Sequence, residues 1–281
     1  MTTNPILITG ATGKTGTRIA NLLEAEGHAV RRAGRAFSPR FDWTRPATFA
    51  PALRGCSAAY LCYYPDYAFP GTTATLTAFV EAARAADVQH IVMLAGRGES
   101  HAQQAEETVR AAGIPTSVMR SAWFAQNFSE GALLDAVHEG VIAMPGDDIR
   151  EPVIDVDDLA AVACQLLRGE PANRTLELTG PESLTFAEMA AVLAIELDAS
   201  ICHQPVTFTE FREALAAASD PDYARIVTDI ARETFDGRNA ATTNDVQILL
   251  GRPPTRFAEF VRREIAGGAW QTHSLQKEAT P

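Results

Sequence analysis

Three glycines near the N-terminus stand at a spacing that suits phosphate binding. The stretch ITGATGKTG places Gly10, Gly13 and Gly16 directly after an apolar run and at the start of a helical pattern. Gly10 permits a sharp turn, Gly13 lets the backbone approach a pyrophosphate, and Gly16 lets the helix pack closely on the strand. In this strand–turn–helix context the pattern predicts a dinucleotide site.

Three arginines follow the second apolar run, where many dinucleotide sites carry an acid that holds the ribose 2′-hydroxyl. The segment AVRRAGRAF has no acid and offers Arg31, Arg32 and Arg35. Strand alternation places Arg31 and Arg35 on one side and Arg32 on the other. A guanidinium fork suits a 2′-phosphate, so NADPH is expected in preference to NADH. The alternative is that these arginines form only a solvated surface.

Apolar runs alternate with amphipathic stretches up to residue 120, which predicts a parallel sheet with helices on both faces. The expected strands are 6–9, 29–33, 58–63, 90–94 and 116–119, and the expected helices are 15–26, 46–54, 72–86 and 103–112. Beyond residue 120 the pattern predicts helices at 123–139, 156–167, 185–197, 208–218 and 255–266, and a strand at 175–178. The expected fold is a Rossmann-type doubly wound parallel α/β sheet with a smaller, mostly helical C-terminal substrate lobe.

The expected organisation has three parts. Residues 1–120 form the dinucleotide-binding core, residues 121–270 complete that core and form the lobe, and residues 271–281 form a flexible tail. Cleft and ligand are expected at the carboxyl ends of the strands, where α/β sheets keep their ligands.

Composition argues against several functional classes. The net charge of -11 argues against nucleic acid as a partner, although residues 1–45 alone carry +4, which indicates a bound anion there. No apolar run reaches the roughly 18 residues of a membrane span, and no signal peptide is recognised. The four cysteines form no CxxC pair and the six histidines no HxxxH pair, so neither metal nor disulfides are expected. A reducing cytoplasm is the expected location.

These motifs together resemble the NmrA-like branch of the atypical short-chain dehydrogenases/reductases, and within it the flavin-free NAD(P)H azoreductases of dye-degrading bacteria. The resemblance rests on ITGATGKTG and the following arginines, on SVMRSAWFAQNF, and on EPVIDVDDLA with LELTGPESLTFAE, and it covers residues 4–265. It implies direct hydride transfer from NADPH to an aromatic substrate, without flavin. The implied cofactor contacts are Gly10, Thr12, Gly13, Lys14, Thr15, Gly16, Arg35, Tyr63, Leu94, Ala95 and Gly96.

The Tyr-x-x-x-Lys dyad of most short-chain dehydrogenases is missing. Its lysine lowers the pKa of the tyrosine, so that the phenol can protonate a substrate oxygen. At the expected place, after the strand 90–94, the chain reads AGRGESHAQQAEETVR, with neither residue type. The only lysines are Lys14 and Lys277, the first in the glycine turn and the second near the C-terminus. A ketoreductase mechanism based on this dyad is therefore not expected.

Candidate residues for chemistry lie near the expected strand ends. Tyr63, Tyr64 and His101 are candidate proton donors, against the alternatives that the tyrosines only pack a loop and the histidine only caps a helix. The candidate substrate contacts are Tyr64, Tyr67, Arg97, Trp123, Phe124 and Asn127. In the expected helix 123–139, Trp123 and Asn127 share a face. Arg97 is either an attractor of anionic substrates or an ordinary surface arginine.

An acidic group at Asp155, Asp157 and Asp158 has the residue types of a metal site, but its place at a helix start favours capping.

The expected substrates accept hydride without a strong acid: azo bonds, their quinone-hydrazone tautomers, quinones and imines. The alternative is an NADP(H)-binding sensor without chemistry. The expected partner is a small aromatic molecule, and the chain is expected to be a monomer or homodimer.

Overall fold

Six parallel strands form the central sheet of the protein, in the order β2-β1-β3-β4-β5-β8. The computed structural model describes residues 4–131, 133–170 and 172–270, so the predicted tail at 271–281 lies outside the described residues. The strands are β1 (Ile6–Ile8), β2 (Val30–Arg32), β3 (Ala58–Leu61), β4 (His90–Gly96), β5 (Thr116–Ser121) and β8 (Arg174–Leu178). The predicted Rossmann-type fold is confirmed.

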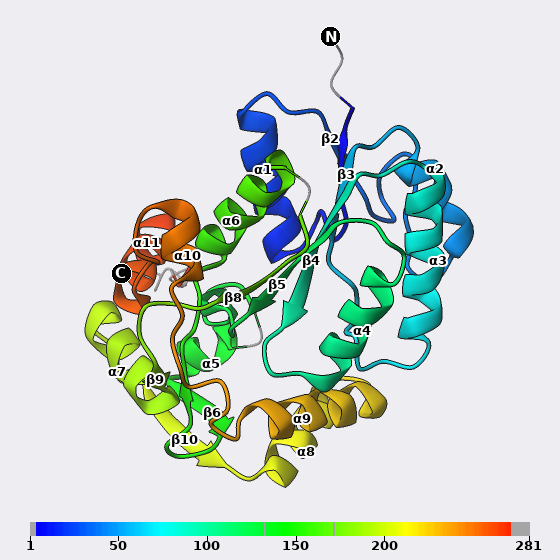
Figure 1. Ribbon diagram of the computed structural model, residues 1–281. Coiled ribbons are helices and arrows are strands. Elements are labelled where there is room, and N and C mark those ends of the chain that lie inside the picture. The colour runs from blue at the N-terminus through cyan, green and yellow to red at the C-terminus, as the bar shows by residue number, and fades with distance from the viewer. Residues whose placement is uncertain (1–3, 132, 171, 271–281) are drawn as a thin grey trace, which may run out of the picture.

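Helices cover both faces of this sheet (Figure 1). On one face lie α1 (Lys14–Ala25), α6 (Val156–Arg168) and α10 (Asp245–Leu250); on the other lie α2 (Phe49–Leu53), with the short 3₁₀ helix η1 (Pro46–Thr48), α3 (Thr72–Ala85) and α4 (Ser100–Arg110). Each face buries its own apolar cluster, the first around Ile19 and Leu159 and the second around Phe49 and Phe79. The continuous apolar strands predicted from the sequence are buried because both faces are covered.

The remaining elements form a lobe beside the sheet (Figure 1). They are the 3₁₀ helix η2 (Ala125–Asn127), α5 (Leu134–Glu139), α7 (Phe186–Leu197), α8 (Phe208–Ala218), α9 (Pro221–Thr234) and α11 (Phe257–Gly267), with strands β6 (Val141–Pro145), β7 (Arg150–Glu151), β9 (Leu184–Thr185) and β10 (Cys202–Val206). Strands β6 and β10 pair in parallel, and β7 and β9 pair antiparallel. A third buried cluster, which includes Phe128, Phe186 and Phe260, fills the lobe.

The helix predicted at 123–139 is wrong. After β5 the chain stays extended and bridges to Ile154 in parallel. Ile154 donates its N–H to the Trp123 carbonyl at 2.8 Å, and Ala125 donates to the Ile154 carbonyl at 2.9 Å. The first of these bonds occupies the Trp123 carbonyl, which a helix would need as an acceptor, and the bridge holds the segment extended, so only η2 and the short α5 form. The prediction also missed α9, α10 and the four strands of the lobe.

The predicted capping motif TFAE is confirmed at the start of α7. The Thr185 hydroxyl accepts the N–H of Glu188 at 3.1 Å, and the Glu188 carboxylate accepts the N–H of Thr185 at 2.9 Å. This reciprocal pair satisfies two backbone donors that would otherwise be unpaired.

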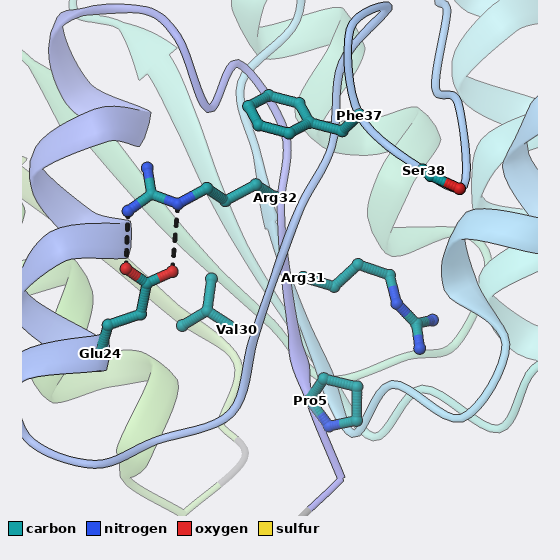
Figure 2. A pocket seen from close by; sticks show the side chains of 7 residues that line it. All are labelled: Pro5, Glu24, Val30, Arg31, Arg32, Phe37 and Ser38. Carbon is teal, nitrogen blue, oxygen red and sulfur yellow. Dashed lines mark hydrogen bonds and ion pairs between the residues drawn. The ribbon is translucent and has the colours of Figure 1, made fainter.

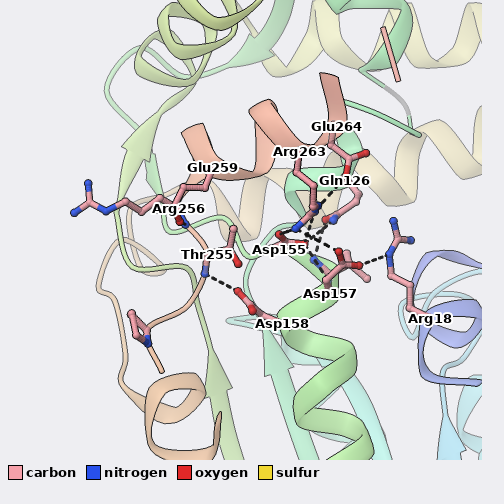
Figure 3. A network of polar contacts seen from close by, with 12 residues as sticks. Arg18, Gln126, Asp155, Asp157, Asp158, Thr255, Arg256, Glu259, Arg263 and Glu264 are labelled. Atoms are coloured by element: carbon pink, nitrogen blue, oxygen red, sulfur yellow. Dashed lines mark hydrogen bonds and ion pairs between the residues drawn. The ribbon is translucent and has the colours of Figure 1, made fainter. Parts of the chain in front are cut away.

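The acidic group at the start of α6 joins the sheet layer to the lobe (Figure 3). Asp155 caps α6 by accepting the N–H of Asp157, as the sequence predicts, and it also binds Arg263 of α11 at 2.6 Å. Asp157 accepts from Arg18 of α1 at 2.7 Å, and Asp158 accepts from Arg252 at 2.6 Å. The described ranges contain no cluster of side chains suited to a metal ion. Each of the three carboxylates accepts from an arginine, and that of Asp155 also caps α6.

Candidate functional site

A cleft of about 920 Å³ lies between the sheet and the lobe. Its floor comes from the segments that follow β1, β3, β4 and β5, at their carboxyl ends. Residues Glu151, Thr234, Phe235 and Asn239 of the lobe form the opposite wall. Because β1 lies between β2 and β3, the strand order reverses beside the glycine turn. Ligands of open α/β sheets bind at such a reversal.

The glycine turn has the local geometry that the sequence predicts. Gly10 has a φ of +61°, a conformation that favours glycine, and a Cβ on Gly16 would lie 2.3 Å from the Gly10 carbonyl oxygen. Gly16 therefore packs helix on strand and is not among the residues that line the cleft. Helix α1 begins without a side-chain cap and without an acid in its first turn. Its first N–H groups are left for an anion in the cleft.

Lys14 lies between the turn and the lobe. Its Nζ donates to Asn127 Oδ1 at 2.9 Å, and both residues line the cleft. Burial lowers the pKa of Lys14, an effect that nearby Glu130 opposes. This contact ties the phosphate turn to the segment after β5, and it involves the only lysine in the described part of the chain.

Of the three arginines after the turn, only Arg35 faces the cleft. Arg31 donates to the Ala52 carbonyl at 2.8 Å, and Arg32 donates to the Glu24 carboxylate at 3.0 Å and 2.8 Å. Both line a small separate pocket (Figure 2), where the side chain of Arg32 points toward α1 and that of Arg31 points away from it. Arg35 is exposed and has no side-chain hydrogen bond or ion pair with any described residue, so its guanidinium is available to a ligand.

Aromatic rings build one wall of the cleft. Tyr63 stacks on Tyr67 with ring centroids 5.6 Å apart, and Trp43 lies 5.0 Å from Tyr63. The Tyr67 hydroxyl donates to the Leu94 carbonyl at 2.6 Å, so this phenol is held in a structural bond. Tyr64 lines the cleft with 71% of its surface exposed. The sequence analysis did not identify Trp43, which lies in the motif FDW on the loop between β2 and η1, as a site residue.

The segment after β5 contributes the predicted residues Trp123, Phe124 and Asn127 to the cleft. The Trp123 ring packs edge-to-face against Phe186 and Phe235 of the lobe, at centroid distances of 5.5 Å and 6.0 Å. These residues reach the cleft from an extended segment and a 3₁₀ turn, and not from the single helix face that the sequence predicted.

Two other predicted residues have different surroundings. Arg97 lines the cleft, but it donates to Glu177 at 2.6 Å and to the carbonyls of Asn239 and Ala241, so its charge is already paired. His101 is exposed on α4 and is absent from the cleft lining. The structure therefore does not place His101 where it could protonate a ligand in the cleft.

Three acidic residues of the cleft were missed as site residues: Asp66, Glu99 and Glu151. None forms an ion pair within the described ranges. Burial, with Asp66 and Glu233 nearby, raises the pKa of Glu99 to about 8, and burial raises that of Glu151 to about 7. Burial also raises the pKa of Asp66. The sequence signal that could have revealed them is an acid shortly after the end of a strand. In GRGE, for example, Glu99 follows three residues after Gly96, the last residue of β4.

No family model matches the sequence. Three curated relatives align over nearly their whole length. The chain is 28% identical to an uncharacterized oxidoreductase, YesF, of Bacillus subtilis (95% of this chain, 97% of the relative). It is 28% identical to the agroclavine dehydrogenase of Claviceps fusiformis (91% and 96%) and 26% identical to the NAD(P)H azoreductase of Xenophilus azovorans (93% and 98%).

Solved structures share the fold. The quinone oxidoreductase QOR2 of Escherichia coli complexed with NADPH superposes with a TM-score of 0.74 at 21% identity, covering 92% of this chain and 99% of that one. NmrA, a negative transcriptional regulator, superposes with a TM-score of 0.71 at 16% identity (94% and 98%). These neighbours share the fold of this chain, which agrees with its resemblance to NmrA-like atypical short-chain dehydrogenases/reductases. The relatives, which include an oxidoreductase and an NAD(P)H azoreductase, support the predicted class, an NAD(P)H-dependent oxidoreductase.

Among the described residues, no helix combines the length and the apolarity needed to cross a bilayer.

Proposed function

We propose that this protein is an NADPH-dependent, flavin-free reductase that delivers hydride directly to an azo bond, or its quinone-hydrazone tautomer, in an aromatic compound. One observation carries the proposal. A single cleft contains the glycine turn before the uncapped helix α1 and Arg35, which has no partner among the described residues. The same cleft also contains the aromatic wall of Trp43, Tyr63 and Tyr67. A dinucleotide and a flat aromatic molecule therefore have complementary surfaces in one space.

The residues present fit the cofactor. The turn at Gly10–Thr15 and the first N–H groups of α1 would hold the pyrophosphate, and Arg35 would hold the 2′-phosphate. Leu94, Ala95 and Gly96, at the end of β4, would lie beside the nicotinamide. When bound, the reduced nicotinamide supplies the hydride. The protein supplies the position of the acceptor and a partly enclosed cleft.

Azo substrates are proposed first because 93% of this chain aligns with the azoreductase of Xenophilus azovorans. Quinones are a close alternative, since the same aromatic wall accommodates them and their reduction also needs one hydride and one proton. Imines form the third alternative, because their iminium cations accept hydride without a strong acid.

The test is a spectrophotometric assay of NADPH oxidation by the purified protein. The panel contains a neutral azo dye, a sulfonated azo dye, a quinone and an aromatic iminium cation. We expect the azo dyes to be reduced at a rate proportional to enzyme concentration, with colourless enzyme and no gain on adding flavin. A yellow protein that needs flavin would contradict direct transfer. NADPH binding without oxidation by any acceptor would instead favour the sensor hypothesis.

A further inference from the structure

We propose that Glu99 is the residue that protonates the substrate, which answers the absence of the Tyr-x-x-x-Lys dyad. This inference rests on the function proposed above. Glu99 lines the cleft three residues after Gly96, the last residue of β4. It therefore follows directly the strand end that would lie beside the nicotinamide.

The carboxyl group of Glu99 lies over Gly96. A Cβ on Gly96 would come within 1.9 Å of Glu99 Oε1 and 2.4 Å of Oε2, so the carboxyl occupies space that only a glycine leaves open. Gly96 pairs with Ser121 of β5, and both residues line the cleft. The carboxyl is thus held at the floor of the cleft, between the ends of β4 and β5.

Glu99 is the N-cap residue of α4, but it does not cap the helix with its side chain. Instead Glu233 of α9 accepts the N–H of Ser100 at 3.2 Å and its hydroxyl at 3.3 Å. Glu233 therefore supplies the negative charge that the start of a helix favours. The carboxyl of Glu99 has no hydrogen bond or ion pair with any described residue, and both oxygens are left for a ligand.

Burial, together with the charges that face Glu99, favours its protonated form. Asp66, from the loop after β3, and Glu233, from α9, both disfavour its anion, and burial disfavours it more. The nearby cations are engaged elsewhere: Arg97 with Glu177, and Arg238 with Glu233 and Asp236. His101 is exposed, and it lies close enough to Asp66 to oppose the rise of the Asp66 pKa. A carboxylic acid with a pKa of about 8 is well suited to give up a proton near pH 7.

The other candidate donors fit less well. The Tyr67 phenol is bonded to the Leu94 carbonyl, Tyr64 is mostly exposed, and Tyr63 has no lysine beside it, because Lys14 is bonded to Asn127. Glu151 is only 2% exposed and lies on β7 in the lobe. Nearby Arg97 also favours its anion.

The chemical step balances without a further reactant. As hydride from NADPH forms an N–H bond at one azo nitrogen, the π electrons move to the other nitrogen. That nitrogen takes the proton of Glu99 as the carboxyl O–H bond breaks. The products are a hydrazine, NADP⁺ and the Glu99 carboxylate, which water in the open cleft reprotonates. An iminium cation needs no such proton, because hydride alone makes it neutral.

The experiment compares Glu99→Gln with the wild type and with Glu107→Gln, a matched change at an exposed position of α4. We expect Glu99→Gln to lower kcat with a neutral azo dye about 100-fold, with turnover of an iminium cation and the Kd for NADPH unchanged. Glu107→Gln should match the wild type throughout. Unchanged azo turnover in Glu99→Gln, or an equal loss with the iminium cation, would overturn the proposal.

A second readout does not depend on turnover. Infrared difference spectra should show a protonated carboxyl band that is lost as pH rises through about 8 in the wild type and is missing in Glu99→Gln. Absence of this band in the wild type overturns the proposal for Glu99 whatever the substrate. A wild type that shows the band but reduces no acceptor contradicts the proposed function instead, and the donor role with it.

Discussion

Two groups of three acidic residues have opposite surroundings in this protein. The strut cluster, Asp155, Asp157 and Asp158, stands at the start of α6, and each of its carboxylates binds an arginine at 2.6 Å or 2.7 Å. The cleft cluster, Asp66, Glu99 and Glu151, has no ion pair within the described ranges.

This difference decides what each cluster does. A buried carboxyl must either be paired or become neutral, because burial without a partner disfavours the charge. Arg263, Arg18 and Arg252 bind the carboxylates of the strut cluster, and these ion pairs connect the lobe to the sheet layer. All three carboxyls of the cleft cluster have raised pKa values, and those of Glu99, about 8, and Glu151, about 7, lie near neutral pH, as a site for proton transfer requires.

Breaking the strut cluster should give the largest effect. Asp155 is 1% exposed and accepts from Arg263 and from Gln126. Asp155→Ala leaves the buried Gln126 amide and the N–H of Asp157 without this acceptor and removes one of the three carboxylates that bind Arg263, so it should lower the free energy of unfolding by about 3–5 kcal/mol. Denaturation in urea measures it, and Asp155→Asn, which keeps a capping oxygen, should cost less. A loss below about 1 kcal/mol would contradict the strut role.

Removing a titratable group from the cleft cluster should change the pH dependence of stability. The neutral form of Glu151 stabilises the fold fully below its unfolded pKa near 4.5, and this contribution is lost as pH rises through about 7. Between pH 5 and pH 8 the wild type should therefore lose up to about 3 kcal/mol relative to Glu151→Gln. Urea denaturation across this range measures the difference. Glu139→Gln, at an exposed position, should follow the wild type; parallel curves for Glu151→Gln would refute the expectation.

The same contrast applies to the arginines. Arg35 has no partner among the described residues, whereas Arg32 binds Glu24. A charge-assisted bond to a phosphate contributes about 1.5–3 kcal/mol, so Arg35→Ala should raise the Kd for NADPH roughly 10- to 150-fold and barely alter that for NADH. Fluorescence titration measures both constants. Arg32→Ala should change neither, and an equal effect of Arg35→Ala on both cofactors would remove the proposed 2′-phosphate site.

The smallest change in the free energy of unfolding is expected at Asp157, the most exposed residue of the strut cluster. The Asp157 side chain is 46% exposed, although it binds Arg18 at 2.7 Å. Because solvent screens such a pair, Asp157→Asn should change the free energy of unfolding by at most about 1 kcal/mol. A loss as large as that of Asp155→Ala would show that pairing alone, and not burial, sets the cost.

The part of the site that local sequence forms was predictable. Gly10, Gly13 and Gly16 act within one strand–turn–helix unit, so their spacing alone indicates a turn that can approach a phosphate. The choice of Arg35 as the arginine that contacts the cofactor also agrees with its place in the cleft. The sequence could not show, however, that Arg31 and Arg32 bind other groups. Their partners come from α2 and α1.

The sequence predictions that were wrong or incomplete concern residues whose partners lie far away in the chain. The helix predicted at 123–139 gave way because Trp123 and Ala125 bond to Ile154. Glu99 went unnoticed, and His101 was preferred, because histidine is the ordinary titrating side chain near neutral pH. The protonation of Glu99 depends on Asp66 and Glu233, which only the folded chain brings near it.

By itself, the sequence determined the parallel sheet, the dinucleotide turn and the absence of a tyrosine–lysine dyad, because apolar periodicity, glycine spacing and residue types are local properties. The tertiary structure decided which charges have partners. Burial and pairing are set by segments that lie far apart in the chain; they pair Asp155 with Arg263, and they raise the pKa of Glu99 at the floor of the cleft to about 8.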